Sequence, residues 1–380
     1  MPDATVLSLL PALLRLSLCL NSPPPPPQAP PAAVVERRLA AMGTVLSLAV
    51  SGRDRATALE ASEAAVGEIA RVEERLTTWR RGGPLSRLNA ASPGETVVLG
   101  GEVAGLLAVV LEWSERTQRA FDPTVLPLVR AWDLRGEGRV PAGSELARAL
   151  AATGPGRFRI DPMTAGARRL SPDAGIDEGA WGKGYALDRA VGELCRAGVR
   201  EALLDLGGQV SAIGRTTVAI ADPRDRSRIA AFLSIADESV STSGNSERGL
   251  LVRGRRIGHL LDPRTGRPAP DFGSVTVVAP SGLAADILST AYFVLGPEKG
   301  LDLSEKLRCQ GQPNEVLFLV VSDGGWKAVA SPGLRSRLEC RELQIRDQGS
   351  PVIPSKARDL PRSRFSDSSG ADSSSLRSSE

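Results

Sequence analysis

Strand-like apolar segments are concentrated in the second half of this chain and constrain its fold class. They occupy residues 201–206, 209–214, 217–221, 230–235, 274–279 and 316–321, and one more, TVLSLAV, occupies residues 44–50. Stretches with apolar residues at helical spacing lie at 54–76, 102–118 and 183–197. Clustered strands with interspersed helices are typical of an α+β fold, because a parallel α/β fold alternates the two regularly. The sequence therefore predicts an α+β domain with mixed or antiparallel sheets and packed helices.

The N-terminal end differs in composition from the body of the chain. Residues 6–20 are apolar enough for the central part of an export signal, but no basic segment precedes them, and Pro11 and Arg15 interrupt them. Cys19 stands where a lipoprotein would be cleaved, although a bulky leucine precedes it. We interpret residues 1–33 as a candidate signal or lipoprotein segment followed by a Pro-rich linker. Three alternatives stay open: the protein is exported, it is attached to a lipid, or the segment is no targeting signal.

The folded part is expected to span residues 34–345. Residues 346–380 are rich in Ser and Arg and contain almost no core-forming residues, which predicts a disordered tail. The loop-like GPGR near residue 155 leaves a division into two domains as an alternative. No apolar run of 18 or more residues follows the N-terminal segment, so we expect no membrane-spanning helix in the body.

Charge and metal-ligating residues exclude several function classes. The chain has 47 basic and 44 acidic residues among 380, and this near balance argues against a nucleic-acid-binding protein. The four cysteines form no CxxC pair, so a zinc site is not expected. His259 is the only histidine, which rules out a multi-histidine metal site and leaves one candidate for a catalytic imidazole.

A hydrophobic helix with three polar residues is predicted at 284–297, AADILSTAYFVLGP. Asp286, Ser289 and Thr290 are spaced so that they share one helical face, and Gly296 with Pro297 would end the helix. Such a face is explained either by exposure to solvent or by a site for a hard cation. The spacing alone leaves both open.

Two further segments could act on an anionic ligand. In IDEGAWGKGYALD (176–188), glycines surround Lys183 before a predicted helix, which suits either a phosphate cradle or a plain turn. In GHLLDPRTGRPAP (258–270), His259 lies near Asp262 and is either a packed residue or a general base. Together with the polar helix face, these segments point to Mg²⁺ and a phosphate or pyrophosphate substrate, because Mg²⁺ prefers oxygen ligands and phosphate.

The chain resembles the ApbE family of flavin transferases in a series of segments that keep the family's order. These are AMGT (41–44), TTWR (77–80), LSRLN (85–89), AFDPTVLPLV (120–129), DEGAWGKGYALD (177–188), DLGGQVSAIG (205–214), STSGNSER (241–248), HLLDPRTGRP (259–268) and the segment 274–301. The resemblance implies an α+β, T-fold-like catalytic domain over 34–345. It also implies an enzyme that binds FAD with Mg²⁺, releases AMP, and attaches FMN through a phosphoester to a Ser or Thr of a partner protein.

The resemblance also implies roles for individual residues. The metal ligands would be Asp286, Thr290 and the backbone carbonyl of Ala180, with Ser289 at a further metal-facing position. His259 would take the proton from the acceptor hydroxyl. The residues that contact FAD would be Met42, Trp79, Ala120, Phe121, Asp122, Asp177, Lys183 and Leu261.

Family members commonly act outside the cytoplasm on subunits of membrane redox complexes, so the resemblance favours a periplasmic or membrane-anchored protein. A cytoplasmic location stays open because the N-terminal signal is weak. Membrane attachment is expected only through the N-terminus, and no nucleic-acid partner is expected.

The chain departs from the family pattern at several positions: Leu126, Glu178, Trp181, Gly182, Gln209 and Ser246. The departures leave the metal face and His259 unchanged, so they bear on selectivity and rate more than on the reaction. Two alternatives therefore accompany FMN transfer: a Mg²⁺-dependent FAD pyrophosphatase that gives FMN and AMP, and a non-catalytic flavin-binding protein.

Overall fold

The computed structural model describes residues 33–245, 250–252 and 254–340. Within these residues an antiparallel sheet of eight strands has the order β1-β2-β6-β7-β10-β15-β16-β17. Of the predicted N-terminal segment (1–33) only residue 33 is described, and the predicted tail (346–380) lies outside the described residues. The proposed domain bounds therefore stay predictions. The strands of this main sheet are β1 (Ala33–Ala41), β2 (Thr44–Gly52), β6 (Ala202–Leu206), β7 (Gln209–Ile213), β10 (Ser239–Gly244), β15 (Gly273–Ala279), β16 (Glu315–Ser322) and β17 (Gly325–Ala330).

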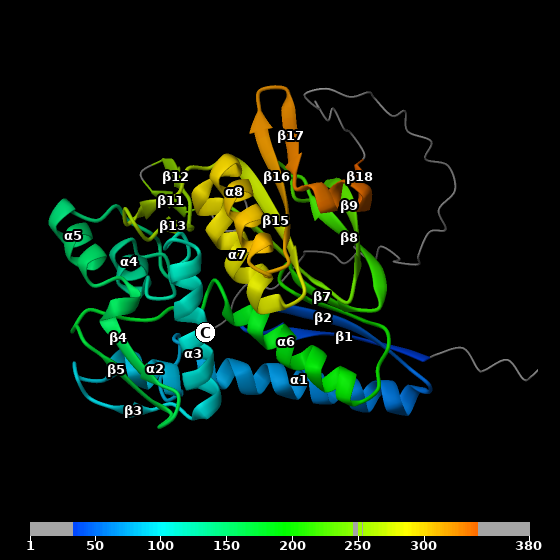
Figure 1. Cartoon of the computed structure of the whole chain (residues 1–380), viewed down its shortest axis with the longest axis horizontal. Helices are drawn as coiled ribbons and strands as arrows, with labels where there is room; N and C mark the ends of the chain where they lie inside the picture. Colours follow the sequence, from blue (N-terminus) through cyan, green and yellow to red (C-terminus); the bar gives the residue numbers. More distant parts are fainter. Residues whose placement is uncertain (1–32, 246–249, 253, 341–380) are drawn as a thin grey trace, which may run out of the picture. The chain divides into compact units, whose positions relative to one another are not determined.

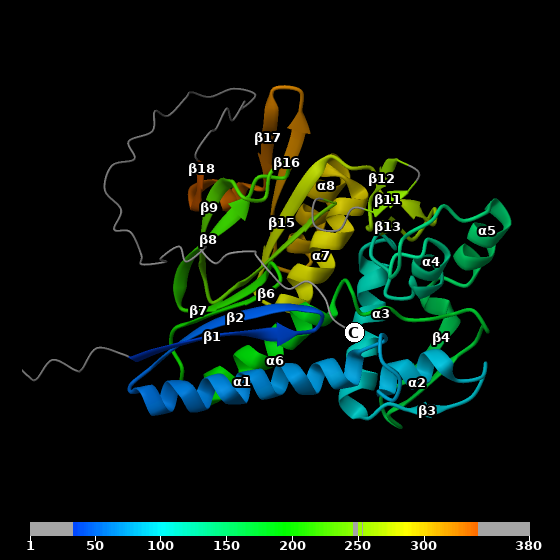
Figure 2. The same cartoon turned by 180° about the vertical axis from the view of Figure 1, so that it is seen from behind.

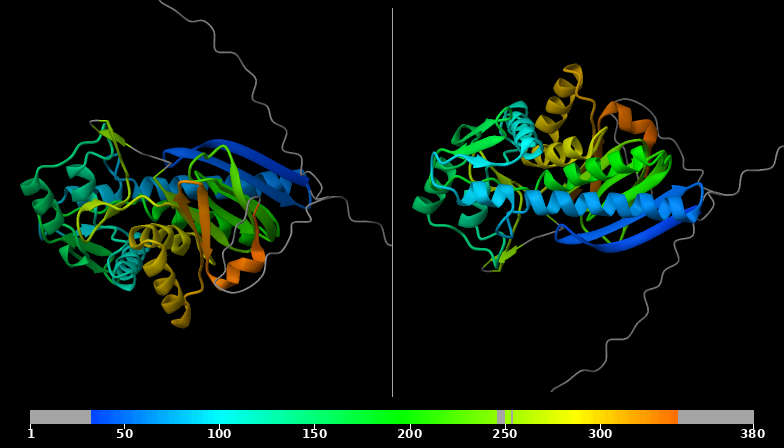
Figure 3. Two further views of the ribbon diagram at one scale, coloured as in Figure 1. Left: turned by 90° about the horizontal axis from the view of Figure 1, so that it is seen from above. Right: turned by 90° about the horizontal axis from the view of Figure 1, so that it is seen from below.

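Helices cover one face of this main sheet, as Figures 1 and 2 show from opposite sides. Helices α1 and α6 lie side by side, which is visible from below in Figure 3. A continuous apolar core joins the sheet to these helices, with Leu204 and Val277 from strands and Ile69, Leu187 and Leu288 from helices. The helices are α1 (Arg55–Leu76), α6 (Gly182–Arg196), α7 (Gly282–Leu295) and α8 (Pro297–Cys309).

A small sheet covers part of the opposite face. Its order is β18-β9-β8, with β8 (Arg215–Ala221), β9 (Ile229–Ala236) and β18 (Leu338–Cys340). Leu233 of this sheet shares a second apolar cluster with Val240 and Leu319 of the main sheet. Successive side chains of β10 (SVSTSG) point to opposite faces of the main sheet. Ser241 and Ser243 therefore face the helices, whereas Val240 faces the small sheet.

The segment between α1 and α6 forms a third group of elements beside α1. It contains α2 (Pro84–Ala90), α3 (Gly101–Arg116), α4 (Leu126–Ala131), α5 (Gly143–Ala151) and a small sheet of β3 (Val97–Val98), β5 (Gly166–Arg169) and β4 (Phe158–Asp161). Two hairpins complete the described part: β11 (Leu250–Val252) with β12 (Arg255–Ile257), and β13 (Leu261–Asp262) with β14 (Arg267–Pro268). Leu261 packs with Leu128 and Trp132 of the α4 region, which ties the second hairpin to this group.

The predicted elements are confirmed with small shifts at their ends. Helix α1 begins at Arg55, where the N-cap Asp54 accepts a 2.8 Å hydrogen bond from the backbone N–H of Thr57. The predicted strands that end at residue 206 and begin at residue 209 are joined by a two-residue hairpin loop in which Gly207 and Gly208 both have positive φ. The α+β class with antiparallel sheets is also confirmed. Among the described residues, no helix is long and apolar enough to cross a membrane.

Candidate active site

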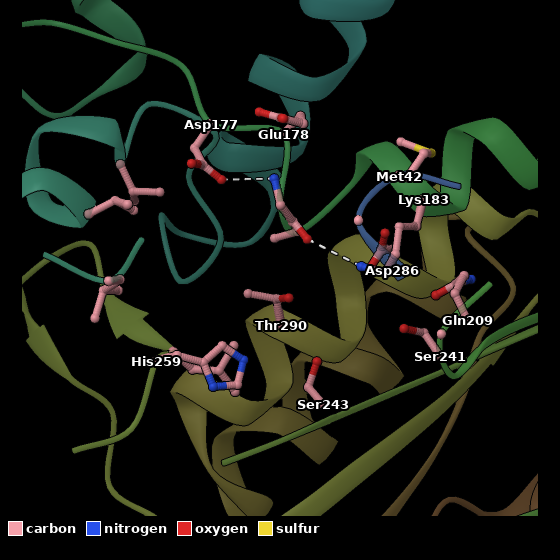
Figure 4. Close-up of a pocket in the computed structure, with 18 of the residues that line it drawn as sticks. Met42, Asp177, Glu178, Lys183, Gln209, Ser241, Ser243, His259, Asp286 and Thr290 are labelled. Carbon is pink, nitrogen blue, oxygen red and sulfur yellow. Dashed lines mark hydrogen bonds between the residues drawn. The ribbon is translucent and has the colours of Figure 1, made fainter. Parts of the chain in front are cut away.

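One cavity of about 650 Å³ collects the residues that the sequence singled out. Its volume lies within the range of small-molecule and cofactor sites. Figure 4 shows the side chains that converge on it from helices, hairpin turns and loops. All predicted site residues except Ser289 line it: Met42, Trp79, Ala120, Phe121, Asp122, Asp177, Ala180, Lys183, His259, Leu261, Asp286 and Thr290.

Two glycines allow helices α6 and α7 to lie in close contact. The residues at this contact, Ala180, Lys183, Asp286 and Thr290, form one side of the cavity, called here the helical side. A Cβ atom at Gly184 in α6 would lie 2.1 Å from the backbone oxygen of Gly282 in α7, and a Cβ at Gly282 would lie 2.5 Å from the oxygen of Gly184. The two backbones can therefore approach this closely only because neither residue has a side chain. The crossing places the turn before α6, with Ala180 and Lys183, against the face of α7 that carries Asp286.

Asp286 is a buried carboxylate at this crossing. Its residue is 5% exposed, and one of its oxygens accepts a 3.0 Å hydrogen bond from the backbone N–H of Gly184. Burial raises the pKa of the Asp286 carboxyl, while the positive charge of Lys183 and the bond from Gly184 act to lower it. A buried carboxylate with so few partners is costly when ionised, so a bound cation would stabilise it.

Asp188 fixes the start of α7. Its two oxygens accept hydrogen bonds from the backbone N–H groups of Gly282 (2.5 Å) and Leu283 (2.9 Å). Burial raises the pKa of Asp188 to about 6; these two bonds oppose the shift, and the charge of Asp286 adds to it. Asp188 does not line the cavity, so its role is to hold α7 in place.

Ser289 does not face the cavity as predicted. Its hydroxyl is fully buried, donates to the backbone oxygen of Asp286 (3.0 Å), and pairs with the hydroxyls of Ser241 (3.0 Å) and Ser243 (2.8 Å). Ser241 and Ser243 themselves line the cavity. The helical spacing put Ser289 on the same broad face as Asp286 and Thr290, but β10 covers that part of the helix. We therefore leave Ser289 out of the candidate ligand set.

The glycine turn before α6 is held by its own hydrogen bonds. Asp177 accepts from the backbone N–H of Gly179 (2.8 Å), and the buried indole of Trp181 donates to the backbone oxygen of Asp177 (2.8 Å). The ammonium of Lys183 donates to the backbone oxygen of Gly179 (3.3 Å) and lines the cavity. A lysine at the start of a helix suits an anionic ligand, because the helix N-terminus also attracts negative charge.

Arg135, which no sequence pattern indicated, lines the opposite part of the cavity. This part is formed by connecting segments that carry Trp79, Arg135 and His259, and it is called here the loop side. The guanidinium of Arg135 lies 4.4 Å from the ring centroid of Trp79, which is 61% exposed. It also binds Asp177 at 2.5 Å and donates to the side chain of Thr78 at 2.6 Å. Arg135 belongs to no recognisable motif, so only its charge opposite Asp177 could have suggested this role.

Glu178 adds a second carboxylate to this loop side. It accepts hydrogen bonds from the backbone N–H (3.1 Å) and hydroxyl of Thr78, and it lies 3.9 Å from the guanidinium of Arg135. Burial and the nearby charge of Asp177 raise the pKa of Glu178, while the bonds from Thr78 act to lower it. Glu178, one of the positions that departs from the family pattern, is therefore part of the ion-paired group around Arg135.

Met42 and Asp122 line other parts of the cavity. Met42 occupies the two-residue turn between β1 and β2 with φ of 48°, and its N–H donates to the carboxylate of Glu73 at 2.8 Å. Asp122 is buried, accepts from the N–H of Thr124 (2.9 Å), and is paired with Arg119 at 3.1 Å. Burial raises the pKa of Asp122, against the effect of these partners.

His259 lies in the loop between β12 and β13 and is half-buried. Figure 4 shows its ring at the edge of the cavity near Thr290 and Ser243. Asp262, three residues further along the chain, accepts from the backbone N–H and guanidinium of Arg264, each at 2.9 Å. His259 is therefore positioned to meet a group that enters the cavity.

The donor atoms on the helical side fit a hard cation. They are the Asp286 carboxylate, the Thr290 hydroxyl and the backbone oxygen of Ala180, all from residues that line the cavity. The described residues contain no cluster of three or more His, Cys, Asp or Glu side chains that could hold a metal ion by themselves. A small oxygen set of this kind suits Mg²⁺, which keeps several waters and binds substrate phosphates.

Comparison with known proteins identifies the family. The model of the ApbE family matches residues 42–312. The chain belongs to the ApbE family. A protein of Klebsiella pneumoniae (strain 342) named FAD:protein FMN transferase is 32% identical over 313 residues, which cover 78% of this chain and 87% of that protein.

Solved ApbE structures share the fold. An ApbE protein of Thermotoga maritima is 28% identical with a TM-score of 0.73, and the match covers 80% of this chain and 99% of that one. The flavinyl transferase ApbE of Pseudomonas stutzeri is also 28% identical, with a TM-score of 0.70, and covers 80% of this chain and 97% of its own.

Within the ApbE fold, three of the five departures among the described residues lie outside the cavity wall: Leu126, Trp181 and Gly182. Trp181 is fully buried in the core, and Leu126 packs against Gly175, where a Cβ would lie 2.7 Å from a Leu126 methyl carbon. A Cβ at Gly182 would lie 3.3 Å from that of Glu178. Glu178 and Gln209, in contrast, line the cavity. Ser246, with the neighbouring Glu247 and Arg248, lies outside the described residues.

Proposed function

We propose that this protein transfers FMN from FAD to a Ser or Thr hydroxyl of a partner protein in a Mg²⁺-dependent reaction. The observation that carries the proposal is the cavity that gathers Asp286, Thr290, Lys183 and His259 at one end of the main sheet. A carboxylate, a hydroxyl, a cation and an imidazole around one space suit the transfer of a phosphoryl group. The name of the Klebsiella pneumoniae relative, FAD:protein FMN transferase, gives FAD as the donor and a protein as the acceptor.

The reaction joins the acceptor oxygen to the phosphorus of the FMN part and breaks the bond from that phosphorus to the AMP oxygen. When bound, Mg²⁺ neutralises charge on the pyrophosphate. Asp286, Thr290 and the Ala180 carbonyl would hold that ion, and Lys183 would bind phosphate oxygens. Trp79 offers an aromatic face for a ring of FAD.

His259 takes the proton of the acceptor hydroxyl. An imidazole with a pKa near neutrality is an effective base for this step, and no other histidine exists in the chain. The proton then resides on a ring nitrogen of His259, while AMP leaves with the electron pair of the broken phosphorus–oxygen bond, beside the positive charge of Lys183. Exclusion of water from the cavity decides whether the protein hydroxyl or water attacks.

The test combines the purified protein with FAD, Mg²⁺ and an acceptor domain that carries a Ser or Thr flavinylation site, followed by a denaturing gel. We expect flavin fluorescence on the acceptor, and its loss when EDTA is added. FMN and AMP without a labelled acceptor would support a pyrophosphatase instead. Bound FAD with no product would support a flavin-binding protein.

We also propose that the protein acts outside the cytoplasm, attached through its N-terminal segment, on a subunit of a redox complex. The apolar residues 6–20 and Cys19 support this proposal. The intact mass of the mature protein, purified from its native host, tests it. A chain that retains Met1 without a lipid would contradict both export with cleavage and lipid attachment.

A further inference from the structure

Gln209 is a departure from the family pattern that reaches the cavity. It is the first residue of β7, is 2% exposed, and lines the cavity. The turn before it is fixed, because Asp205 accepts from the N–H of Gly208 at 2.8 Å and a Cβ at Gly207 would lie 2.4 Å from the hydroxyl of Thr44. The Gln209 side chain is therefore held at one place in the wall.

The orientation of the Gln209 amide follows from its one hydrogen bond. Its nitrogen donates to the backbone oxygen of Gly282 at 3.3 Å, and a carbonyl requires a donor, so the amide oxygen points the other way. That oxygen is buried and has no hydrogen-bond partner among the described residues. Burying an acceptor without a partner destabilises the site, so a ligand that satisfies it gains affinity.

The position of the amide identifies the kind of ligand. Gly282 lies one helical turn before Asp286 in α7, and Figure 4 shows the Gln209 oxygen on the side of Asp286 and Lys183. Phosphate oxygens are acceptors, as is the amide oxygen, so a pyrophosphate cannot satisfy it directly. A cation, or water bound to a cation, can do so.

We propose that the amide oxygen of Gln209 belongs to the donor set of the cation site and accepts a hydrogen bond from water bound to the metal ion. This inference rests on the proposed Mg²⁺ site. It adds an amide oxygen from β7 to the carboxylate, hydroxyl and carbonyl donors around α7. Mg²⁺ retains several of its waters when bound to proteins, so an acceptor at this place has a partner in the loaded site.

The experiment measures Mn²⁺ binding by the loss of its free electron paramagnetic resonance signal, with ADP present as a pyrophosphate that carries no FMN. Gln209→Met keeps the length of the side chain and removes the oxygen, and we expect at least about tenfold weaker Mn²⁺ binding. Gln209→Glu keeps an oxygen and adds charge, so we expect binding at least as tight as in the parent protein. Gln310→Met makes the same change at an exposed position after α8 and should leave binding unchanged.

The variants separate the amide oxygen from the amide nitrogen. Both Gln209→Met and Gln209→Glu lose the bond to Gly282, so equal weakening in the two would overturn the proposal and assign Gln209 to holding α7. Unchanged binding in Gln209→Met would overturn it as well. If Gln209→Met does not fold, Gln209→Leu replaces it in the same comparison.

A further variant tests the metal site on which this inference rests. Asp286→Asn should abolish Mn²⁺ binding. If Asp286→Asn still binds Mn²⁺, the proposed metal site is wrong. If Asp286→Asn loses Mn²⁺ binding and Gln209→Met keeps it, only the proposed role of Gln209 is overturned.

Discussion

The two sides of the cavity are built in different ways. The helical side consists of Ala180 and Lys183 from the turn into α6 and Asp286 and Thr290 from α7, and it rests on backbone contact between the two helices. The loop side contains Trp79, Arg135 and His259, which come from connecting segments. Asp286 is 5% exposed, whereas Trp79 is 61% exposed.

This difference indicates a division of tasks. The helical side cannot shift without loss of packing in the main core, so its oxygen atoms keep the fixed positions that a small cation requires. The loop side is joined by an ion pair and a stacked arginine, which can adjust to a flavin and to an acceptor segment. We therefore expect changes on the helical side to remove activity and changes on the loop side to reduce it.

The largest effect is expected from Asp286→Asn. This change keeps the shape of the side chain but removes the charge that would bind the ion. Because a bound metal ion contributes several kcal/mol to catalysis, we expect FMN transfer to fall by at least about 10³-fold. Transfer rates measured across a range of Mg²⁺ concentrations test this. Full activity at low Mg²⁺ would remove Asp286 from the metal site.

His259→Ala should slow transfer by about 10²-fold, in the range for loss of a general base. The effect is smaller because the pyrophosphate would still be held by the helical side. FAD binding, followed through its fluorescence, should stay unchanged. An unaltered transfer rate would mean that another group takes the proton.

Gly184→Ala tests the rigidity of the helical side. The added Cβ would lie 2.1 Å from the backbone oxygen of Gly282 and 2.8 Å from the Asp286 Cβ, so we expect a loss of about 1–3 kcal/mol in the free energy of unfolding. Gly67→Ala in α1 is the control, because nothing lies within 4 Å of its Cβ position. That change should leave stability unchanged or raise it by up to about 1 kcal/mol. Denaturant unfolding measures both, and equal stability of the two variants would contradict the close crossing.

The smallest effect is expected from Arg135→Met, on the loop side. Loss of the cation above Trp79 and of the pair with Asp177 should raise the KM for FAD by about three- to tenfold, with kcat nearly unchanged. Arg116→Met removes a similar stacking contact with Trp113 on α3 and should leave KM unaltered. If Arg135→Met instead lowered kcat by about a hundredfold, as loss of a general base does, Arg135 would take part in the chemical step. The loop side would then contribute a second group to the chemical step, beside His259.

Helical spacing and glycine placement singled out residues of the helical side as a possible site and left their roles open. Asp286, Thr290 and Lys183 were recognised in this way and line the cavity. Ser289 was misplaced, because helical spacing does not reveal that β10 covers part of the face. The family resemblance supplied Met42 and Trp79, whereas the α+β class already followed from the clustered strands and interspersed helices.

Arg135 and Gln209 were beyond the reach of local patterns. Arg135 lies far in sequence from Trp79 and Asp177, and its contacts depend on how the α4–α5 connection folds over the cavity. Gln209 was noticed only as a departure. Its orientation depends on one hydrogen bond to Gly282, which no spacing rule contains.

The ratio of AMP released to FMN attached tests the proposed transfer reaction at its central step. It is measured with purified protein, FAD, Mg²⁺ and an acceptor domain, by chromatography and intact mass. We predict about one AMP for each FMN on the acceptor, because bond formation to the acceptor oxygen and release of AMP are one event. We also predict that Asp286→Asn yields neither product. AMP in large excess over attached FMN, or a labelled acceptor in the Asp286→Asn reaction, would contradict the proposed transfer.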